Sequence, residues 1–396
     1  MKNRVTSISD AADLTAAFAL ADGGPGAGFL RHLRLTSPEM GVDASRTAAL
    51  LVAVSWLPLC VLCAFEGLTR KGAQIPFFHD FGAQARLLVG VPLLVFAEVP
   101  IGRAWREVLG RMLTNHLIKT ADLDRFEALL VHALKQRDSR VAEFSLIFLV
   151  YVASISTVFR APYETGNTWI HPVANDRLSV AGYWYAFVSL PIFQFLAARW
   201  VYRISLWAIT LRHISRLDLA LTPAHPDRAG GIAFVSQSLA PLGIILFALS
   251  TVIAATIAER ILFDGEKLAE YQWAYLIVIV LLVGLFAGPV FVFTPQLLEL
   301  KQRGLRQYGE LASAHHQSFD ARLSESSSEP ALAGIESRAA LESSFQVVKA
   351  MRFAPIDLGD LAWMLAPALL PVIPLLLTVM PAATLLQDIV KVAKVI

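Results

Sequence analysis

Seven apolar runs, each about long enough to cross a lipid bilayer, constrain the fold of this chain more than any other feature. A helix needs about 20 apolar residues to cross the hydrocarbon layer, and 56% of the 396 residues are hydrophobic while only 17% are charged. Backbone groups in lipid must satisfy their own hydrogen bonds, which favours helices. The sequence therefore predicts an all-α, polytopic membrane helical bundle of six or seven spans. The runs cover residues 47–65, 86–102, 142–160, 181–206, 238–258, 272–295 and 361–381.

The distribution of basic residues predicts the orientation of these spans. Cytoplasmic loops of membrane proteins carry an excess of Lys and Arg. With the N-terminus inside, the predicted cytoplasmic segments hold twenty-three Lys and Arg residues, whereas the loops on the opposite side hold five. We therefore expect a cytoplasmic N-terminus.

The runs and the segments between them divide the chain into four regions. A cytoplasmic N-terminal arm is followed by membrane helices one to six, which include a cytoplasmic helical insertion at 103–140. A second cytoplasmic helical segment comes next, and a proline-rich end completes the chain. In order, the regions are residues 1–45, 46–298, 299–358 and 359–396. Within the insertion, apolar residues at three- and four-residue steps predict an amphipathic helix over 120–137, with Thr120 or Asp122 as its N-cap.

Four prolines distinguish the last run from the other six. Each interior proline removes a backbone donor and kinks a helix, which lipid tolerates only where the freed carbonyl groups find another partner. The run predicts either a kinked span or a re-entrant hairpin that leaves the C-terminus inside. The tail after it, residues 383–396, has the pattern of a short amphipathic helix at the membrane interface. The prolines are Pro367, Pro371, Pro374 and Pro381.

Several function classes lack support in the sequence. The net charge of +2 and the absence of a dense basic tract argue against a nucleic-acid partner. His315, His316 and Asp320 have the spacing of helical metal ligands but no identifiable third ligand, so no metal site is predicted. No phosphate-binding, dinucleotide-binding or nucleophile motif occurs, so no cofactor is predicted and an enzyme is disfavoured.

Glu98 is the formal charge that lies deepest in a predicted span, about twelve residues into the second run. A carboxylate at that depth costs a few kcal/mol unless it is paired or protonated, which makes it a candidate for ion or proton handling. The alternative is a structural ion pair with Arg103 or Arg106 near the cytoplasmic surface. The sequence favours the structural alternative.

Arg199 and Arg203 share one face of the fourth run, with Trp200 and Trp207 beside them. The run from residue 181 rises about 27 Å before it reaches them, which places both arginines at the predicted cytoplasmic rim. One hypothesis is an aromatic and basic anchor whose charged ends reach the interface. The other is a positive collar at the inner mouth of an anion path.

Small residues characterise the fifth and sixth runs. Ser250, Thr251 and Thr256 could line a solute path, but the sequence favours close helix packing as the reason for these small residues. Gly284 and Gly288 form a GxxxG pattern, which predicts a close helix contact. At the outer end of the fifth run, Glu259 belongs to a short acidic loop that we expect to be solvated.

The polar loop Thr222–Gly231 interrupts the apolar sequence before the fifth run. One hypothesis treats its glycine turn as an anion-binding nest to which His225 and Arg228 add charge. The other treats it as a rigid connector, in which Asp227 caps the backbone and Arg228 contacts the acidic helix at 122–127. The sequence favours the connector.

The run Trp184–Trp200, then Ser215–Leu219 and His225-Pro-Asp-Arg-Ala-Gly-Gly231, resembles a family of uncharacterised multi-pass membrane proteins from Gram-negative bacteria. The similarity extends over most of the chain after residue 85, through the Arg303–Gly309 segment and the last span. It implies a bacterial inner-membrane location and carries no function with it.

Two functions are consistent with these features. The first is a channel or transporter for a small ion, with Glu98 as its titratable group and a positive inner mouth formed by Arg199, Arg203 and Arg228. The second is a non-transporting scaffold or sensor that recruits a soluble partner through its cytoplasmic helices. In either case the lipid bilayer is a partner, and the close-packing pattern predicts a homo-oligomer.

Overall fold

The computed structural model describes residues 44–70, 73–160, 168–172, 177–324 and 331–377, together with 15, 18, 20, 36–37 and 41–42. Most of this part of the chain is helical. Its only sheet is a short antiparallel pair, β1 (Thr36–Ser37) and β2 (Gly41–Val42). The predicted all-α bundle is therefore confirmed.

Six helical segments in the described part of the chain are long and apolar enough to cross a membrane. They coincide with the first six predicted runs, and the chain is accordingly a multi-pass membrane protein. In the seventh run the apolar helix α16 (Leu358–Leu369) is shorter than a span. The six spans are Ala44–Phe65, Phe81–Thr114, Arg140–Phe159, Val180–Ile214, Ala233–Asp264 and Leu268–Leu311.

The second, fourth and fifth spans are each built from several helical pieces, and each contains one π-helical turn, a wider turn than that of an α-helix. These turns are η2 (Ala85–Gly90), η4 (Tyr185–Ser189) and η7 (Arg260–Asp264). The second span runs through α4 (Phe81–Gln84), η2, α5 (Val91–Phe96) and α6 (Glu98–Thr114). The fourth runs through α10 (Val180–Trp184), η4 and α11 (Leu190–Ile214), and the fifth through η5 (Ala233–Ser238), η6 (Ala240–Leu242), α12 (Gly243–Glu259) and η7.

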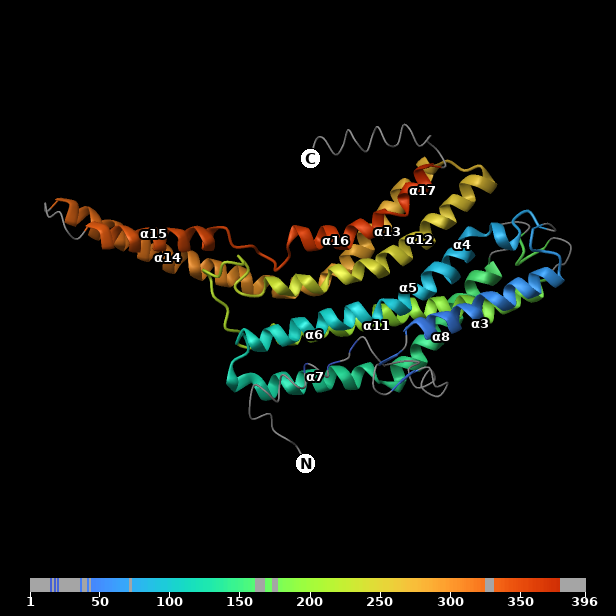
Figure 1. Ribbon diagram of the computed structural model, residues 1–396, viewed down its shortest axis with the longest axis horizontal. Coiled ribbons are helices and arrows are strands. Elements are labelled where there is room, and N and C mark those ends of the chain that lie inside the picture. The colour runs from blue at the N-terminus through green and yellow to red at the C-terminus, as the bar shows by residue number, and fades with distance from the viewer. Residues whose placement is uncertain are drawn as a thin grey trace, which may run out of the picture.

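These three spans pack together in the middle of the bundle. Helix α11 lies along α5, and α12 contacts α4, η2 and α5 (Figure 1). The first and third spans, α3 (Ala44–Phe65) and α8 (Arg140–Arg160), pack against the α10–α11 side. The sixth span begins with α13 (Leu268–Ala287) and η8 (Gly288–Phe293), and η8 packs against α11.

One glycine lets the second and fourth spans approach closely. A Cβ atom added to Gly90 in η2 would lie 2.7 Å from the ring of Phe193 in α11. Gly90 and its neighbours Val91 and Leu94 are buried, so the seam between the two spans is tightly packed at this level. By contrast, the predicted close contact at Gly284 and Gly288 is not made by the described residues, none of which lies within 4 Å of a Cβ at either glycine. The expected homo-oligomer stays a prediction.

The proline-rich end forms two short helices rather than one straight span. Helix α16 ends at Leu369, and α17 (Val372–Leu377) begins after Pro371. The carbonyl oxygen of Ala368, one turn before the break, accepts hydrogen bonds from the hydroxyl groups of Ser250 and Tyr275. The helix therefore breaks within the proline-rich run, with the partner that a broken helix in lipid requires, and the choice between a kinked span and a re-entrant hairpin stays a prediction. The remainder of the predicted run and the tail 383–396 lie outside the described residues.

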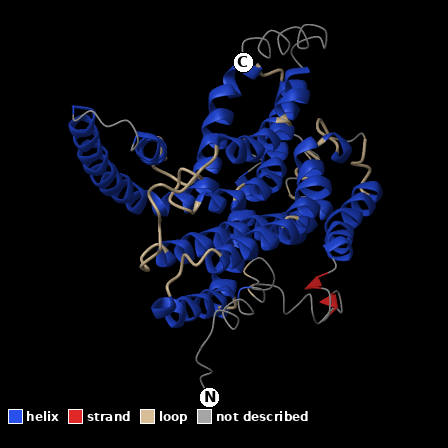
Figure 2. Cartoon of the chain, turned by 60° about the vertical axis from the view of Figure 1, so that its left-hand side comes forward, coloured by secondary structure: helices blue, strands red, loops and turns tan. Residues whose placement is uncertain are grey.

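Outside the spans, both predicted helical regions are present. Helix α7 (Leu123–Arg137) follows a 3₁₀ turn, η3 (Thr120–Asp122), and buries Phe126 and Leu130. The sixth span continues into α14 (Thr294–Ser324), which packs against α15 (Ala331–Lys349), and this pair projects beyond the rest of the bundle (Figure 1). In a view turned by 60° (Figure 2), helices make up most of the chain and the two short strands are the only ones drawn among the described residues. Phe18 and Leu20 of the N-terminal arm belong to the main core.

Gly90 lies at a tight contact and Gly284 lies beside open space, so a Gly→Val substitution should affect stability differently at the two positions. We expect Gly90→Val to destabilise the protein by about 1–3 kcal/mol, because the added atoms overlap Phe193 in a packed seam. Gly284→Val is the matched control, since space is open there, and should leave stability unchanged. Thermal unfolding of the purified proteins in detergent tests this. Equal melting temperatures for the two variants would contradict the assignment of Gly90 to a tight contact.

Candidate functional site

Glu98 lies inside the bundle and pairs with two arginines of the fourth span. Its Oε1 atom is 3.1 Å from Nη1 of Arg199 and 3.1 Å from Nη1 of Arg203. The Glu98 side chain is 10% exposed, and those of Arg199 and Arg203 are 5% and 0% exposed. We call these three residues the inner cluster. The structural interpretation of Glu98 as an ion-paired residue holds, but its partners are on α11 rather than at positions 103 and 106.

The predicted aromatic and basic anchor at the rim is wrong. Both arginines and both tryptophans of that segment are buried. Trp200 donates its indole N–H to the carbonyl of Leu94 at 2.8 Å, and the guanidinium of Arg203 lies 5.1 Å from the Trp200 ring centroid. Trp207 stacks on Trp105 of α6 with ring centroids 4.9 Å apart. We expected these side chains to reach the membrane interface, but they instead pack between the fourth span and the second.

A second group of polar side chains gathers at the opposite end of the same seam. Asp80 precedes α4, Arg86 lies in η2 and Glu259 ends α12, while Tyr185 comes from η4. Asp80 and Glu259 both border Gly82, because Glu259 accepts the Gly82 backbone N–H and a Cβ at Gly82 would lie 3.4 Å from Asp80 Oδ1. We call these four residues the outer cluster, from the side that the predicted topology gives them.

Backbone and indole donors hold the two carboxyl groups of the outer cluster in place. Asp80 accepts from the backbone N–H of Ala83 at 2.6 Å and from the indole of Trp169 at 2.9 Å. Glu259 accepts from the backbone N–H of Gly82 at 3.3 Å. A Cβ at Gly82 would lie within 3.4 Å of both Asp80 and Arg86, so the glycine leaves the space that the cluster fills.

Arg86 is held by neutral oxygen atoms rather than by a direct bidentate pair with a carboxylate. Its guanidinium donates to the hydroxyl of Tyr185 at 2.8 Å and to that of Thr256 at 3.5 Å. Tyr185 is buried, whereas Asp80, Arg86 and Glu259 are half-buried. The outer cluster therefore combines two acids, one base and one phenolic hydroxyl, with the hydroxyl of Thr256 beside it, in a site that is partly open at the end of the spans.

The π-helical turns converge on this cluster. Arg86 lies in η2, Tyr185 begins η4, and Glu259 immediately precedes η7. Such turns interrupt the regular hydrogen bonding of an α-helix and often occur at functional sites. Here they bring side chains from three spans to one point.

Packed apolar residues separate the two clusters along the second span. From Arg86 to Glu98 the helix rises about 18 Å at 1.5 Å per residue. Gly90 and Phe193 close the seam between these levels. The inner and outer clusters thus lie at opposite ends of a single interhelical seam.

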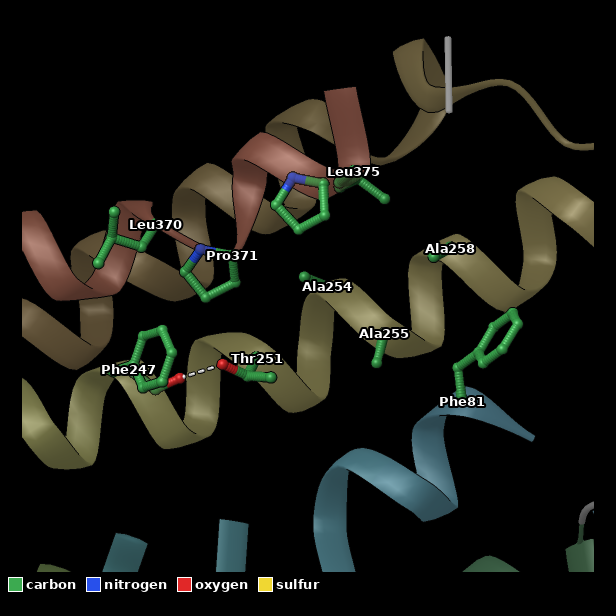
Figure 3. A pocket seen from close by; sticks show the side chains of 10 residues that line it. Phe81, Phe247, Thr251, Ala254, Ala255, Ala258, Leu370, Pro371 and Leu375 are labelled. Carbon is green, nitrogen blue, oxygen red and sulfur yellow. Dashed lines mark hydrogen bonds between the residues drawn. The ribbon is translucent and has the colours of Figure 1, made fainter. Parts of the chain in front are cut away.

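The three small polar residues predicted to line a path in the fifth span face different surroundings. Ser250 is buried and bridges to Tyr275 and Ala368. Thr256 contacts Arg86 and donates to the carbonyl of Val252. Thr251 lines a groove of about 450 Å³, but its hydroxyl donates to the carbonyl of Phe247 at 2.7 Å (Figure 3). They do not form one common lining.

The groove beside Thr251 is apolar, which argues against an ion path there. Helix α12 contributes one wall, and the α16–α17 break contributes another, with Phe81 of α4 at one end (Figure 3). A dehydrated ion in such surroundings would lack ligands. The other side chains that line it are Phe247, Ala254, Ala255, Ala258, Leu370, Pro371, Pro374 and Leu375.

The loop Thr222–Gly231 contains an anion-binding nest, but the anion is its own Asp227. The carboxylate of Asp227 accepts from the backbone N–H groups of Ala229, Gly231 and Ala233 at 2.8, 3.1 and 3.0 Å. His225 Nδ1 lies 2.8 Å from the same carboxylate. The connector interpretation of Asp227 is therefore confirmed.

The predicted contact of Arg228 with the acidic helix at 122–127 is wrong. The Arg228 side chain is exposed, and its backbone adopts a φ of 56°. The carbonyl of Arg228 accepts from the backbone N–H of Arg352 at 2.7 Å, which ties the loop to the segment after α15. Asp122 instead pairs with Arg125 and accepts from the backbone N–H of Asp218.

The sequence interpretation missed the outer cluster. It assigned Glu259 to a solvated acidic loop and left Asp80 and Arg86 outside the candidate set. One signal was present, because Arg86 and Glu259 both lie within one residue of the edge of an apolar run. Their convergence depends on helix packing, which periodicity does not encode. Among the described residues no group of three potential ligands could hold a metal ion, and the side chains of His315, His316 and Asp320 lie outside the described set.

No protein-family model, curated protein or solved structure matches this chain.

Removing the carboxylate of the inner cluster should destabilise the folded protein. We expect Glu98→Gln to destabilise the protein by about 3–5 kcal/mol, because it takes away the negative charge that two buried arginines contact. Glu107→Gln removes an exposed ion pair with Arg111 on the same helix and should cost less than about 1 kcal/mol. Denaturant unfolding in mixed micelles compares the two. A Glu98→Gln variant as stable as Glu107→Gln would rule out a buried, charged inner cluster.

Asp227 should make the loop sensitive to acid. Burial disfavours its charged form, but the three backbone N–H groups and His225 outweigh burial and lower its pKa. Since the folded-state pKa lies below the unfolded value of about 3.9, the stabilisation is present above about pH 4 and lost as the pH falls through the folded-state pKa.

Hydrogen exchange of a peptide that contains Gly231 measures this stabilisation. Protection should fall on acidification in the native protein, and Asp227→Asn should lower it about tenfold or more at neutral pH. Asp124→Asn, at an exposed position, is the control. Unchanged protection in Asp227→Asn would contradict the role assigned to the carboxylate.

Proposed function

We propose that this protein is a membrane channel or transporter for a small ion, with a path along the seam between the second, fourth and fifth spans. The observation that carries the proposal is the presence of two charged clusters at opposite ends of this seam. Charged side chains inside membrane spans are costly and commonly mark ion pathways or proton relays. A purely structural bundle of this size could be packed with apolar residues alone.

The two clusters carry different charges, so the outer and inner ends of the proposed path would differ in electrostatic potential. We propose a bacterial inner-membrane location with the N-terminus in the cytoplasm, as the basic residues predict, so that the Asp80 end faces outward. A cation or proton would then meet the two carboxyl groups of the outer cluster first. The inner cluster, with two arginines and one carboxylate, would present net positive charge to its other end.

The closed seam favours a transporter over an open channel. Gly90 and Phe193 leave no room between the second and fourth spans at a level between the two clusters. An ion could pass only if these spans separate, which is the expected behaviour of a carrier that alternates between two open states.

Ion flux into proteoliposomes tests the proposal. Purified protein is reconstituted into vesicles that contain an ion- or pH-sensitive dye, and an ion gradient is imposed across the membrane. We expect uptake well above that of protein-free vesicles, and a reduction of at least tenfold for Arg86→Gln, which loses the only base of the outer cluster. Arg111→Gln, at a partly exposed position on α6, is the matched control. Failure to detect flux of protons, monovalent cations or small anions at any pH or voltage would defeat the proposal.

A scaffold function is the second candidate, and one observation favours it. Helices α14 and α15 pair with each other and extend away from the spans (Figure 1), as a docking platform would. A soluble partner bound in fixed stoichiometry, and lost when residues 299–355 are deleted, would support this function over transport.

A further inference from the structure

The groove of about 450 Å³ beside Thr251 follows the fifth span for about half the thickness of a bilayer. Phe247 and Phe81 lie at its two ends (Figure 3). Along α12 the groove extends from Phe247 to Ala258, which is about 17 Å at 1.5 Å per residue. The hydrocarbon core of a bilayer is about 30 Å thick. The groove is therefore about as long as the hydrocarbon chains of one leaflet.

The lining of this groove can hold a hydrocarbon but offers no hydrogen bond to a ligand. Small side chains of α12 form its floor, and Pro371 at the α16–α17 break contributes to the facing wall. Among the described residues that line it, Thr251 has the only polar side chain, and its hydroxyl already donates to the carbonyl of Phe247. The small residues of the floor are Ala254, Ala255 and Ala258.

The groove is open toward the surroundings of the spans rather than enclosed. Leu370, which borders it at the end of α16, is 52% exposed. A second apolar groove of about 420 Å³ shares Phe247 and Leu370 with the first and continues to Trp363, which is 73% exposed. In a bilayer these surfaces face lipid, and an empty groove would forfeit the dispersion contacts of its lining. Hydrocarbon chains are the medium that reaches the groove from the side.

We propose that the groove between α12 and the α16–α17 break is a binding site for one acyl chain of a membrane phospholipid. Phe81 directly follows Asp80 and Ala258 directly precedes Glu259, so the groove ends at the level of the outer cluster. The polar headgroup lies beyond this end, and the acyl chain runs along α12 toward Phe247. None of the residues that line the groove belongs to either charged cluster, so the site is separate from the proposed ion path.

Photocrosslinking in vesicles tests the site. The protein is reconstituted into phosphatidylcholine vesicles that contain a small fraction of phosphatidylcholine with a diazirine on one acyl chain, and mass spectrometry measures the label on each peptide after illumination. The reference is the α13 peptide that contains Ala274, an exposed position on the sixth span. We expect about fivefold more label on the peptides that contain Ala255 or Leu370, an excess that corresponds to about 1 kcal/mol.

Substitutions that fill the groove should remove this excess. Ala255→Leu and Ala258→Leu each place a larger side chain on its floor, so label on the Leu370 peptide should fall to the level of the α13 peptide. Ala274→Leu is the matched control, because it adds the same atoms at an exposed position, and it should keep the excess. In detergent without phospholipid, all three variants should unfold close to the melting temperature of native protein, because the added atoms enter open space.

Two results would overturn the acyl-chain site. One is even label over the groove and α13 peptides, or an excess that survives in both groove-filling variants, since contact with bulk lipid would explain either. The other is an excess that appears only after residues 378–396 are deleted, or only on dilution of the protein in the bilayer. The chain's own tail or a second copy would then occupy the groove in place of lipid.

Discussion

The cost of leaving a charge or a backbone hydrogen-bonding group unmatched in lipid governs this structure. At the inner cluster, the cost is met by placing Glu98 between Arg199 and Arg203. At the proline break, the hydroxyl groups of Ser250 and Tyr275 satisfy the carbonyl of Ala368. In the loop before the fifth span, Asp227 satisfies three backbone N–H groups. These matches join the second span to the fourth, and the fifth and sixth spans to the proline-rich end.

The sequence predicted the helices well because their signal is local. Membrane-length runs depend only on consecutive residues, and six of the seven became spans of the described chain. The kink in the last run followed from its four prolines, although the sequence did not show that the break would fall at Pro371 rather than at Pro367. Asp227 was also predictable, since an aspartate in a proline- and glycine-rich turn finds its backbone partners within a few residues.

The candidate site was less predictable because its contacts join residues far apart in the chain. Glu98 was expected to pair with arginines one or two turns away, yet its partners are about a hundred residues distant. Arg199 and Arg203 were placed at a lipid interface by helix length, whereas burial against the second span decides their environment. Asp80 and Glu259 converge only because Gly82 and the π-helical turns allow α4 and α12 to meet.

The π-helical turn η2 lies between Asp80 and Glu98 on the second span. A π-helical turn holds about one residue more than an α-helical turn. If η2 were to relax into regular α-helix, α5 and α6 would rotate by about 100° relative to α4 and shift by about 1.5 Å along the axis. Glu98 would then face away from α11 while Asp80 stayed in place. The wide turn at η2 therefore sets the direction in which Glu98 faces relative to Asp80 on the same span.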